Sequence, residues 1–157
     1  PVLFASLAPS AFILFSKPFS PAATPRALIL GHAAGVACGW TAWWTVSAAF
    51  GAPVSVDRFG PAVALSVLSA FAATSLLLVR LRSDHAPACA TALIVAMGKV
   101  TAPADLLVML GAVVLLAASA VTLMRLGGVR APLWNSGPSR AATCPLPVAD
   151  GAPRRAA

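Results

Sequence analysis

Long uncharged stretches dominate the hydrophobic pattern of this chain. Three of them, Ala27–Phe50, Pro61–Val79 and Leu106–Met124, contain no formally charged residue. Each approaches or exceeds the roughly 20 apolar residues with which a helix crosses the hydrocarbon core of a bilayer. Glycine, proline or arginine residues follow each stretch and mark its end. The pattern therefore predicts three membrane-spanning helices.

Two shorter apolar segments lie beside these stretches. Val2–Ser16 holds Pro9 in its middle, and Pro87–Met97 is only about 16 Å long at the helical rise. Each is either a broken or half-helix that faces a protected interior, or a short span lengthened by its flanks. The predicted fold class is an all-α membrane protein, a bundle of about five transmembrane or half-transmembrane helices. Their expected ranges are 2–16, 27–50, 61–79, 86–98 and 104–126.

Composition supports a lipid bilayer as the main partner. The chain is 59% hydrophobic and 10% charged, against about 25% charged residues in soluble domains. The net charge of +7 comes from basic residues scattered between apolar runs, which argues against a nucleic-acid partner. Cys38, Cys89 and Cys144 form no CxxC motif or Cys/His cluster. We therefore predict no disulfide, no metal and no cofactor.

The distribution of basic residues predicts an orientation. Successive hydrophilic regions contain 2, 1, 2, 1 and 5 Lys or Arg residues. The positive-inside rule then places the first, third and last regions in the cytoplasm, with a cytoplasmic C-terminus, as in a bacterial inner membrane. Residues 135–157, rich in Pro, Ala and Arg, are expected to form a disordered cytoplasmic tail after a transmembrane domain at 1–134.

Two parts of the sequence share a similar pattern, which suggests a repeated unit. An apolar segment with an early proline precedes a glycine-containing helix twice, and the distances from Pro9 to Gly31 and from Pro87 to Gly111 are 22 and 24 residues. With helix 61–79 between them, the two units cross in opposite directions. This is the arrangement of an inverted-topology repeat, common in secondary transporters, and a complete repeat would have one more helix upstream of Pro1. The matching segments are short and rich in alanine, so the alternative is a chance similarity.

Four strings occur along the chain in a fixed order: Ala5–Phe12, residues 20–32 with Pro25-Arg26 and Gly31-His32, His85–Val95, and Pro132-Leu133-Trp134. This ordered set resembles the HPP family of integral membrane proteins, named for a His-Pro-Pro motif. The resemblance covers roughly residues 1–134. It implies a multi-helix membrane protein, and some plant and cyanobacterial members are linked to nitrite transport. Many bacterial members have no assigned role.

The chain departs from the family pattern at small residues. The His-Pro-Pro motif reads His85-Ala86-Pro87, and Cys89 stands where glycine is usual. Ala27 replaces the asparagine of a Pro-Arg-Asn string, and Ala8 replaces a glycine. These departures leave the implied fold intact and the identity of the substrate open.

Basic residues and two predicted helix starts gather on one side of the membrane. Ser83 or Asp84 can cap the helix that begins near Pro87, so that free N–H groups and the helix dipole favour an anion. Asp84 would compete for the same donors. The residues predicted to bind substrate are Ser10, Arg26, His32, Arg80, Arg82, His85, Pro87 and Thr91.

These residues also have ordinary structural interpretations. The arginines serve equally as positive-inside anchors. His32 is an intramembrane ionisable residue, which favours a functional role, but a hydrogen bond to a backbone carbonyl accounts for it as well. His85 can cap a loop, Ser10 and Thr91 can bond their own helices, and Cys89 suits packing.

The sequence supports two hypotheses for the function of the protein. The first hypothesis is a membrane transport protein for a small inorganic anion such as nitrite. The alternative is a non-transporting scaffold or subunit, or a homo-oligomer, that packs through the small face of Gly31, Gly35 and Gly39. No HExxH, GxSxG or carboxylate pair is present, so we assign no catalytic residue and expect no enzyme.

Overall fold

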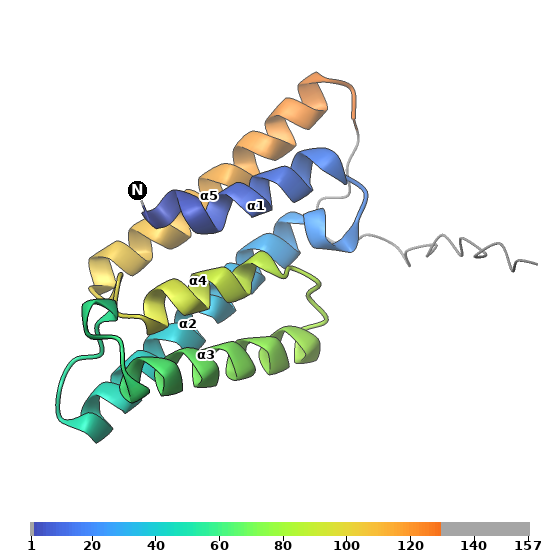
Figure 1. Cartoon of the computed structure of the whole chain (residues 1–157). Coiled ribbons are helices and arrows are strands. Elements are labelled where there is room, and N and C mark those ends of the chain that lie inside the picture. The colour runs from blue at the N-terminus through green and yellow to red at the C-terminus, as the bar shows by residue number, and fades with distance from the viewer. Residues whose placement is uncertain (1, 130–157) are drawn as a thin grey trace, which may run out of the picture.

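The computed structural model describes the backbone of residues 2–129 and the side chains from Ser6 onwards. This part of the chain is helical and contains no strand (Figure 1). All five predicted helices are confirmed, each with ends within two residues of the expected ones. They are α1 (Val2–Ser16), α2 (Pro25–Phe50), α3 (Pro61–Arg80), α4 (Pro87–Ala96) and α5 (Pro103–Leu126), with short 3-10 turns η1 (Pro21–Ala23) and η2 (Val56–Arg58). The predicted tail at 135–157 and Trp134 lie outside the described residues.

Proline residues define where most of the helices begin. Proline is the first residue of α2, α3, α4 and α5, a position whose N–H would have no partner inside the helix in any case. Thr24 adds a side-chain cap to α2, because its hydroxyl oxygen accepts a hydrogen bond from the Ala27 N–H at 3.2 Å. Pro9 differs from the others, since it lies inside α1 and removes one backbone donor there.

Successive helices run in opposite directions, with α2 in contact with α3, α4 and α5 (Figure 1). The small face of α2 meets α4 of the same chain. A methyl group on Gly31 would lie 3.1 Å from the Cβ of His85, and one on Gly39 would lie 2.6 Å from the Ala92 carbonyl oxygen. One on Gly35 would collide with the carbonyl oxygen of Ala88. The glycine face therefore brings the backbones of α2 and α4 together within the chain.

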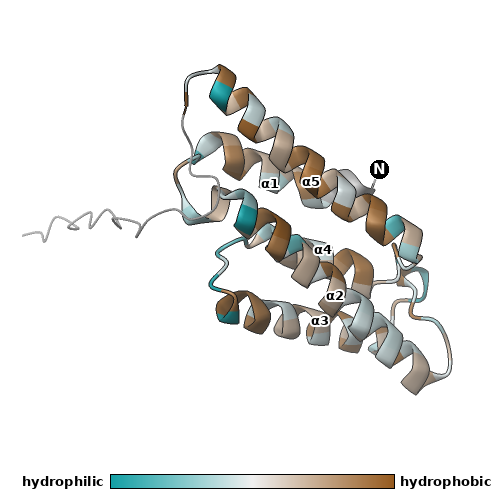
Figure 2. Ribbon diagram, turned by 180° about the vertical axis from the view of Figure 1, so that it is seen from behind, coloured by the Kyte–Doolittle hydropathy of each residue, from teal (hydrophilic) through white to brown (hydrophobic). Residues whose placement is uncertain are grey.

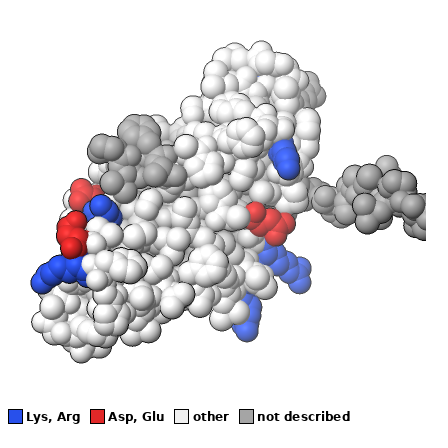
Figure 3. All heavy atoms as spheres, viewed as in Figure 1, with Lys and Arg blue, Asp and Glu red and all other residues white. Residues whose placement is uncertain are grey.

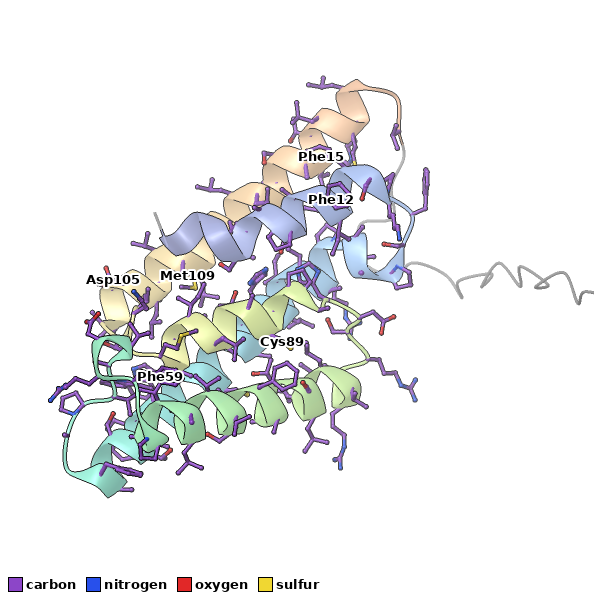
Figure 4. The ribbon with its side chains drawn as sticks, viewed as in Figure 1. Phe12, Phe15, Phe59, Cys89, Asp105 and Met109 are labelled. Carbon is purple, nitrogen blue, oxygen red and sulfur yellow. The ribbon has the colours of Figure 1, made fainter. Side chains whose placement is uncertain are left out.

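Large apolar side chains lie on the outside of the bundle, among them Leu107 and Leu115 of α5, which are 70% and 71% exposed. Figure 2 shows that hydrophobic residues occur along all five helices. The side chains of Phe12 and Phe15 point outward from α1 (Figure 4) and are 71% and 52% exposed, whereas Met109 of α5 is fully buried. Such an outer surface is unfavourable in water and suited to lipid. The buried core lies between the helices.

Among the described helices, α3 and α5 are both long and apolar enough to cross a membrane. The first predicted stretch, Ala27–Phe50, is helical as expected and lies in the 26-residue helix α2, but α2 is less apolar than α3 and α5 and does not meet the same test. His32, the glycines and the tryptophans of α2 lower its hydropathy. The shorter helices α1 and α4 remain apolar segments below spanning length.

Charged side chains gather at the two ends of the bundle and leave an uncharged band between them (Figure 3). Among the described residues, the end formed by the α1–α2 and α3–α4 loops and the end of α5 has five basic residues and one acidic residue. They are Lys17, Arg26, Arg80, Arg82, Arg125 and Asp84. The opposite end has Arg58 and Lys99 with Asp57 and Asp105. The bundle is therefore basic at one end and balanced at the other.

Candidate functional site

Four of the eight residues predicted to bind substrate form one buried cluster near the basic end of the bundle. Ser10 comes from α1, His32 from α2, Thr91 from α4, and His85 from the loop that precedes α4. None of these four side chains has any exposed surface. Ser10 and His85, which are hydrogen-bonded here, lie 75 residues apart in the sequence.

The four side chains are joined in one chain of hydrogen bonds. The hydroxyl oxygen of Ser10 lies 2.9 Å from Nε2 of His32 and 3.0 Å from Nε2 of His85. Nδ1 of His32 lies 2.7 Å from the hydroxyl oxygen of Thr91. At the other end, Nδ1 of His85 lies 2.9 Å from the carbonyl oxygen of Ala22.

When both histidines are neutral, the Ala22 carbonyl at the end of this series of hydrogen bonds fixes the direction of each one. A carbonyl only accepts, so His85 donates Nδ1–H to Ala22 and its Nε2 accepts the Ser10 hydroxyl proton. The Ser10 oxygen then accepts Nε2–H from His32. Nδ1 of His32 is left as an acceptor, and the Thr91 hydroxyl donates to it. The two histidines are therefore assigned opposite tautomers.

This assignment leaves no polar nitrogen of the pair without a partner. Each of the four imidazole nitrogens takes part in one hydrogen bond of suitable length. A buried polar network of this kind is stable only if its members are satisfied, because an unpaired group in a low-dielectric interior is costly. The pair is thus satisfied in its neutral state.

Close packing of α2 against the start of α4 positions the pair. Gly31 leaves the room that His85 occupies, since a Cβ at that position would lie 3.1 Å from the His85 Cβ and 3.4 Å from its Cδ2. The rings of His32 and His85 then lie 5.2 Å apart at an interplanar angle of 60°. Burial lowers the pKa of the loop residue His85, although its hydrogen bond to the Ala22 carbonyl acts in the opposite direction.

The other predicted site residues lie around the cluster. Arg26 is half-buried in the first turn of α2, Arg80 and Arg82 are exposed, and Pro87 is buried at the start of α4. Among the described residues, no hydrogen bond or ion pair connects these arginines to the histidines. The structure thus separates the predicted set into a buried polar cluster and a basic rim at the same end of the bundle.

The start of α4 differs from the sequence prediction. Its N-cap is Ala86, without a side-chain hydrogen bond, rather than Ser83 or Asp84. The Ser83 hydroxyl instead donates to the carbonyl oxygen of Ala27 at 3.2 Å, and so joins the loop to α2. The N–H groups of Ala88 and Cys89 donate to the backbone oxygens of His85 and Ala86. These two donors are therefore occupied, and the helix start is a weaker anion site than we predicted.

Two participants in the cluster are backbone carbonyls that sequence reasoning did not find. One is that of Ala22, and the other is that of Ser6, which lies 3.4 Å from the Ser10 hydroxyl. Every residue carries a carbonyl, so no residue type marks these two. For metals, the described part of the chain holds no group of three His, Cys, Asp or Glu residues placed to bind an ion.

A family model named HPP, transmembrane region, matches residues 1–132 of the chain. The chain belongs to this HPP family. It is therefore a membrane protein, and the resemblance noted from the sequence strings is confirmed. No curated protein and no solved structure matches the chain.

Proposed function

We propose that this HPP-family protein transports a small inorganic anion, such as nitrite, across the membrane. The observation that carries the proposal is the fully buried chain of Ser10, His32, His85 and Thr91 inside a bundle with an apolar exterior. Ionisable side chains within a membrane bundle are expensive to bury and mark ion or proton paths in many transporters. Nitrite is the substrate implied by the family, and it comes from that resemblance alone.

The chemistry of the cluster suits a small oxygen anion. Nε2–H of His32 and the hydroxyl groups of Ser10 and Thr91 are donors, and an anion oxygen can replace a protein oxygen as their acceptor. The cluster is closed, because its four side chains are fully buried. Transport therefore requires a second conformation in which the helices separate here, as alternating access demands.

The basic end of the bundle offers the route of approach. Five basic residues and one acidic residue lie at the end where the cluster is found, and a local excess of positive charge raises the concentration of anions. The same excess makes this the cytoplasmic end under the positive-inside rule, which places the end of α5 in the cytoplasm.

The scaffold alternative has less support. It requires the face of Gly31, Gly35 and Gly39 to be open to another protein or to a second copy. In this chain α4 covers that face, and a methyl group on any of the three glycines would press on α4 or on His85. We therefore favour transport over the scaffold alternative.

Uptake by vesicles tests the proposal. The full chain is reconstituted in liposomes, and uptake of nitrite, nitrate and chloride is measured between pH 7 and 8, with protein-free liposomes as the control for leakage of nitrous acid. We expect protein-dependent nitrite uptake that Ser10→Ala abolishes. Ser66→Ala is the matched control, because Ser66 is equally buried but donates to the Ala96 carbonyl, outside the cluster. Equal uptake by both variants would remove the cluster as the site, and no uptake of any anion by the folded wild-type protein would refute transport.

A further inference from the structure

The Ser10 hydroxyl has a second acceptor within reach. In the neutral cluster it donates to Nε2 of His85, but the carbonyl oxygen of Ser6, one turn earlier in α1, also lies 3.4 Å from the Ser10 oxygen. A hydroxyl group carries one proton and two lone pairs. Ser10 can therefore rotate its proton towards Ser6 and accept N–H groups from both histidines at once.

The cluster thus has two complete hydrogen-bond arrangements, and they differ by one proton. In the first, both histidines are neutral. In the second, His85 carries protons on both ring nitrogens, Nδ1–H directed to Ala22 and Nε2–H to Ser10. His32 keeps the same two partners in both arrangements. Either state leaves every ring nitrogen of the pair with a partner.

We propose that the cluster takes up one proton with each anion, so that anion transport is coupled to proton movement. The inference rests on the transport function proposed above. The proton comes from a hydronium ion in the water at the basic end of the bundle: one O–H bond of hydronium breaks, one N–H bond forms at Nε2 of His85, and a water molecule is released. No other bond of the protein or the anion changes, and the Ser10 hydroxyl only changes the acceptor to which it donates.

The charges around the pair explain why the proton and the anion would bind together. A buried imidazolium without a counter-charge is strongly disfavoured. Among the described residues, no carboxylate forms a hydrogen bond or ion pair with either histidine. The charged and titratable groups on the elements near the pair are Lys17 after α1, Arg26 and Cys38 in α2, Arg80 at the end of α3, Arg82 and Asp84 in the loop, Cys89 in α4, and Asp105 and Arg125 in α5.

Most of these groups are basic, and they lie at the same end as the pair. Asp84 is exposed beside His85 in the sequence, and Asp105 lies at the opposite end of the bundle. The missing counter-charge is therefore supplied by the anion itself. Once both are bound, the cluster has the same net charge as when it is empty. By reciprocity, the anion raises the proton affinity of the site as much as the proton raises its anion affinity.

Nuclear magnetic resonance of the ring nitrogens tests this coupling directly. His32 and His85 are the two histidines of the chain, so a sample labelled with nitrogen-15 at histidine gives signals from these residues alone. Spectra of the full chain in nanodiscs are recorded with and without sodium nitrite, and sodium chloride controls for ionic strength. We expect two neutral rings of opposite tautomer without nitrite, and one imidazolium at saturation. The apparent nitrite affinity should fall roughly tenfold for each unit of rising pH while the free site stays neutral.

The outcomes separate this inference from the proposed function. Nitrite binding or uptake with both rings neutral and no pH dependence would overturn the coupling and leave transport intact. Absence of nitrite binding and uptake would overturn transport, and the coupling with it. Ser10→Ala should lose the nitrite-induced imidazolium, whereas Ser66→Ala should retain it. If Ser10→Ala does not fold, the wild-type spectra with and without nitrite still decide whether an imidazolium forms.

Discussion

A methyl group at position 35 tests the close packing of α2 against α4, on which the histidine cluster depends. In Gly35→Ala the new Cβ would collide with the carbonyl oxygen of Ala88, a backbone atom that cannot move aside as a flexible side chain does. Gly111→Ala in α5 is the matched control, because nothing lies within 4 Å of a Cβ there. Both positions lie inside helices.

The expected size of the effect follows from this comparison. Replacing glycine by alanine inside a helix gains up to about 1 kcal/mol in helix propensity. Both variants share this gain, so it cancels in the difference between them. Only Gly35→Ala overfills a packed interface, at a cost of about 1–3 kcal/mol. For a chain of this size, the difference corresponds to a melting temperature roughly 2–12 °C below that of Gly111→Ala.

The assay is thermal unfolding of both variants in the same detergent, followed by the histidine spectra of the folded samples. We expect Gly35→Ala to melt at the lower temperature. The histidine signals should also shift, because Ala88 lies one turn before Thr91, whose hydroxyl is 2.7 Å from Nδ1 of His32. Equal melting temperatures and unchanged signals in the two variants would refute the close contact between α2 and α4.

Two further predictions concern the cluster. Thr91→Val removes the hydroxyl that donates to His32 and should lower the free energy of unfolding by about 1–3 kcal/mol. Thr74→Val, at an equally buried threonine whose hydroxyl has no partner, should leave it unchanged or raise it, and equal losses in denaturant unfolding would contradict the assignment. Burial lowers the pKa of His85 in the folded state, so the unfolded chain binds more protons. The free energy of unfolding should therefore be independent of His85 protonation above pH about 6.5 and should decrease as the pH falls below that value. Melting curves between pH 8 and 5 measure this loss, saturating nitrite should reduce it, and a flat profile would contradict it.

Helix positions were predictable because the signals that set them are local. A proline at the first residue of α3 and the arginine at its end are visible in the sequence, and Pro61–Val79 was expected where Pro61–Arg80 is found. Pro9 is an exception to this pattern, because it lies inside α1 and removes one backbone donor without ending the helix. A run of hydrophobic residues carries no information on which face will be buried, so the packing order of the helices was not predictable in the same way.

The residues of the cluster were predictable by type, whereas their connection was not. Histidines in an apolar context stand out because burial is costly for them, and Ser10 and Thr91 were near the motifs. The sequence predicts an anion site at the start of α4 because its N–H groups are free in the pattern, with Ser83 or Asp84 as the expected cap. The Ser83 hydroxyl instead bonds to Ala27, and this choice depends on the distance between α2 and the loop, which only the fold determines.

The position of the Ala22 carbonyl decides the protonation pattern of the cluster, and the sequence does not give that position. Without that acceptor, His85 could hold its proton on either nitrogen, and the Ser10 hydroxyl would have no preferred direction. A single backbone oxygen, 2.9 Å from Nδ1, selects one tautomer for His85, and this choice passes through Ser10 to fix the opposite tautomer of His32. A proton added at Nε2 of His85 must then reverse the Ser10 hydroxyl, with Ser6 as the acceptor it would turn to. The response of the site to a proton therefore depends on two backbone oxygens as much as on the two histidines.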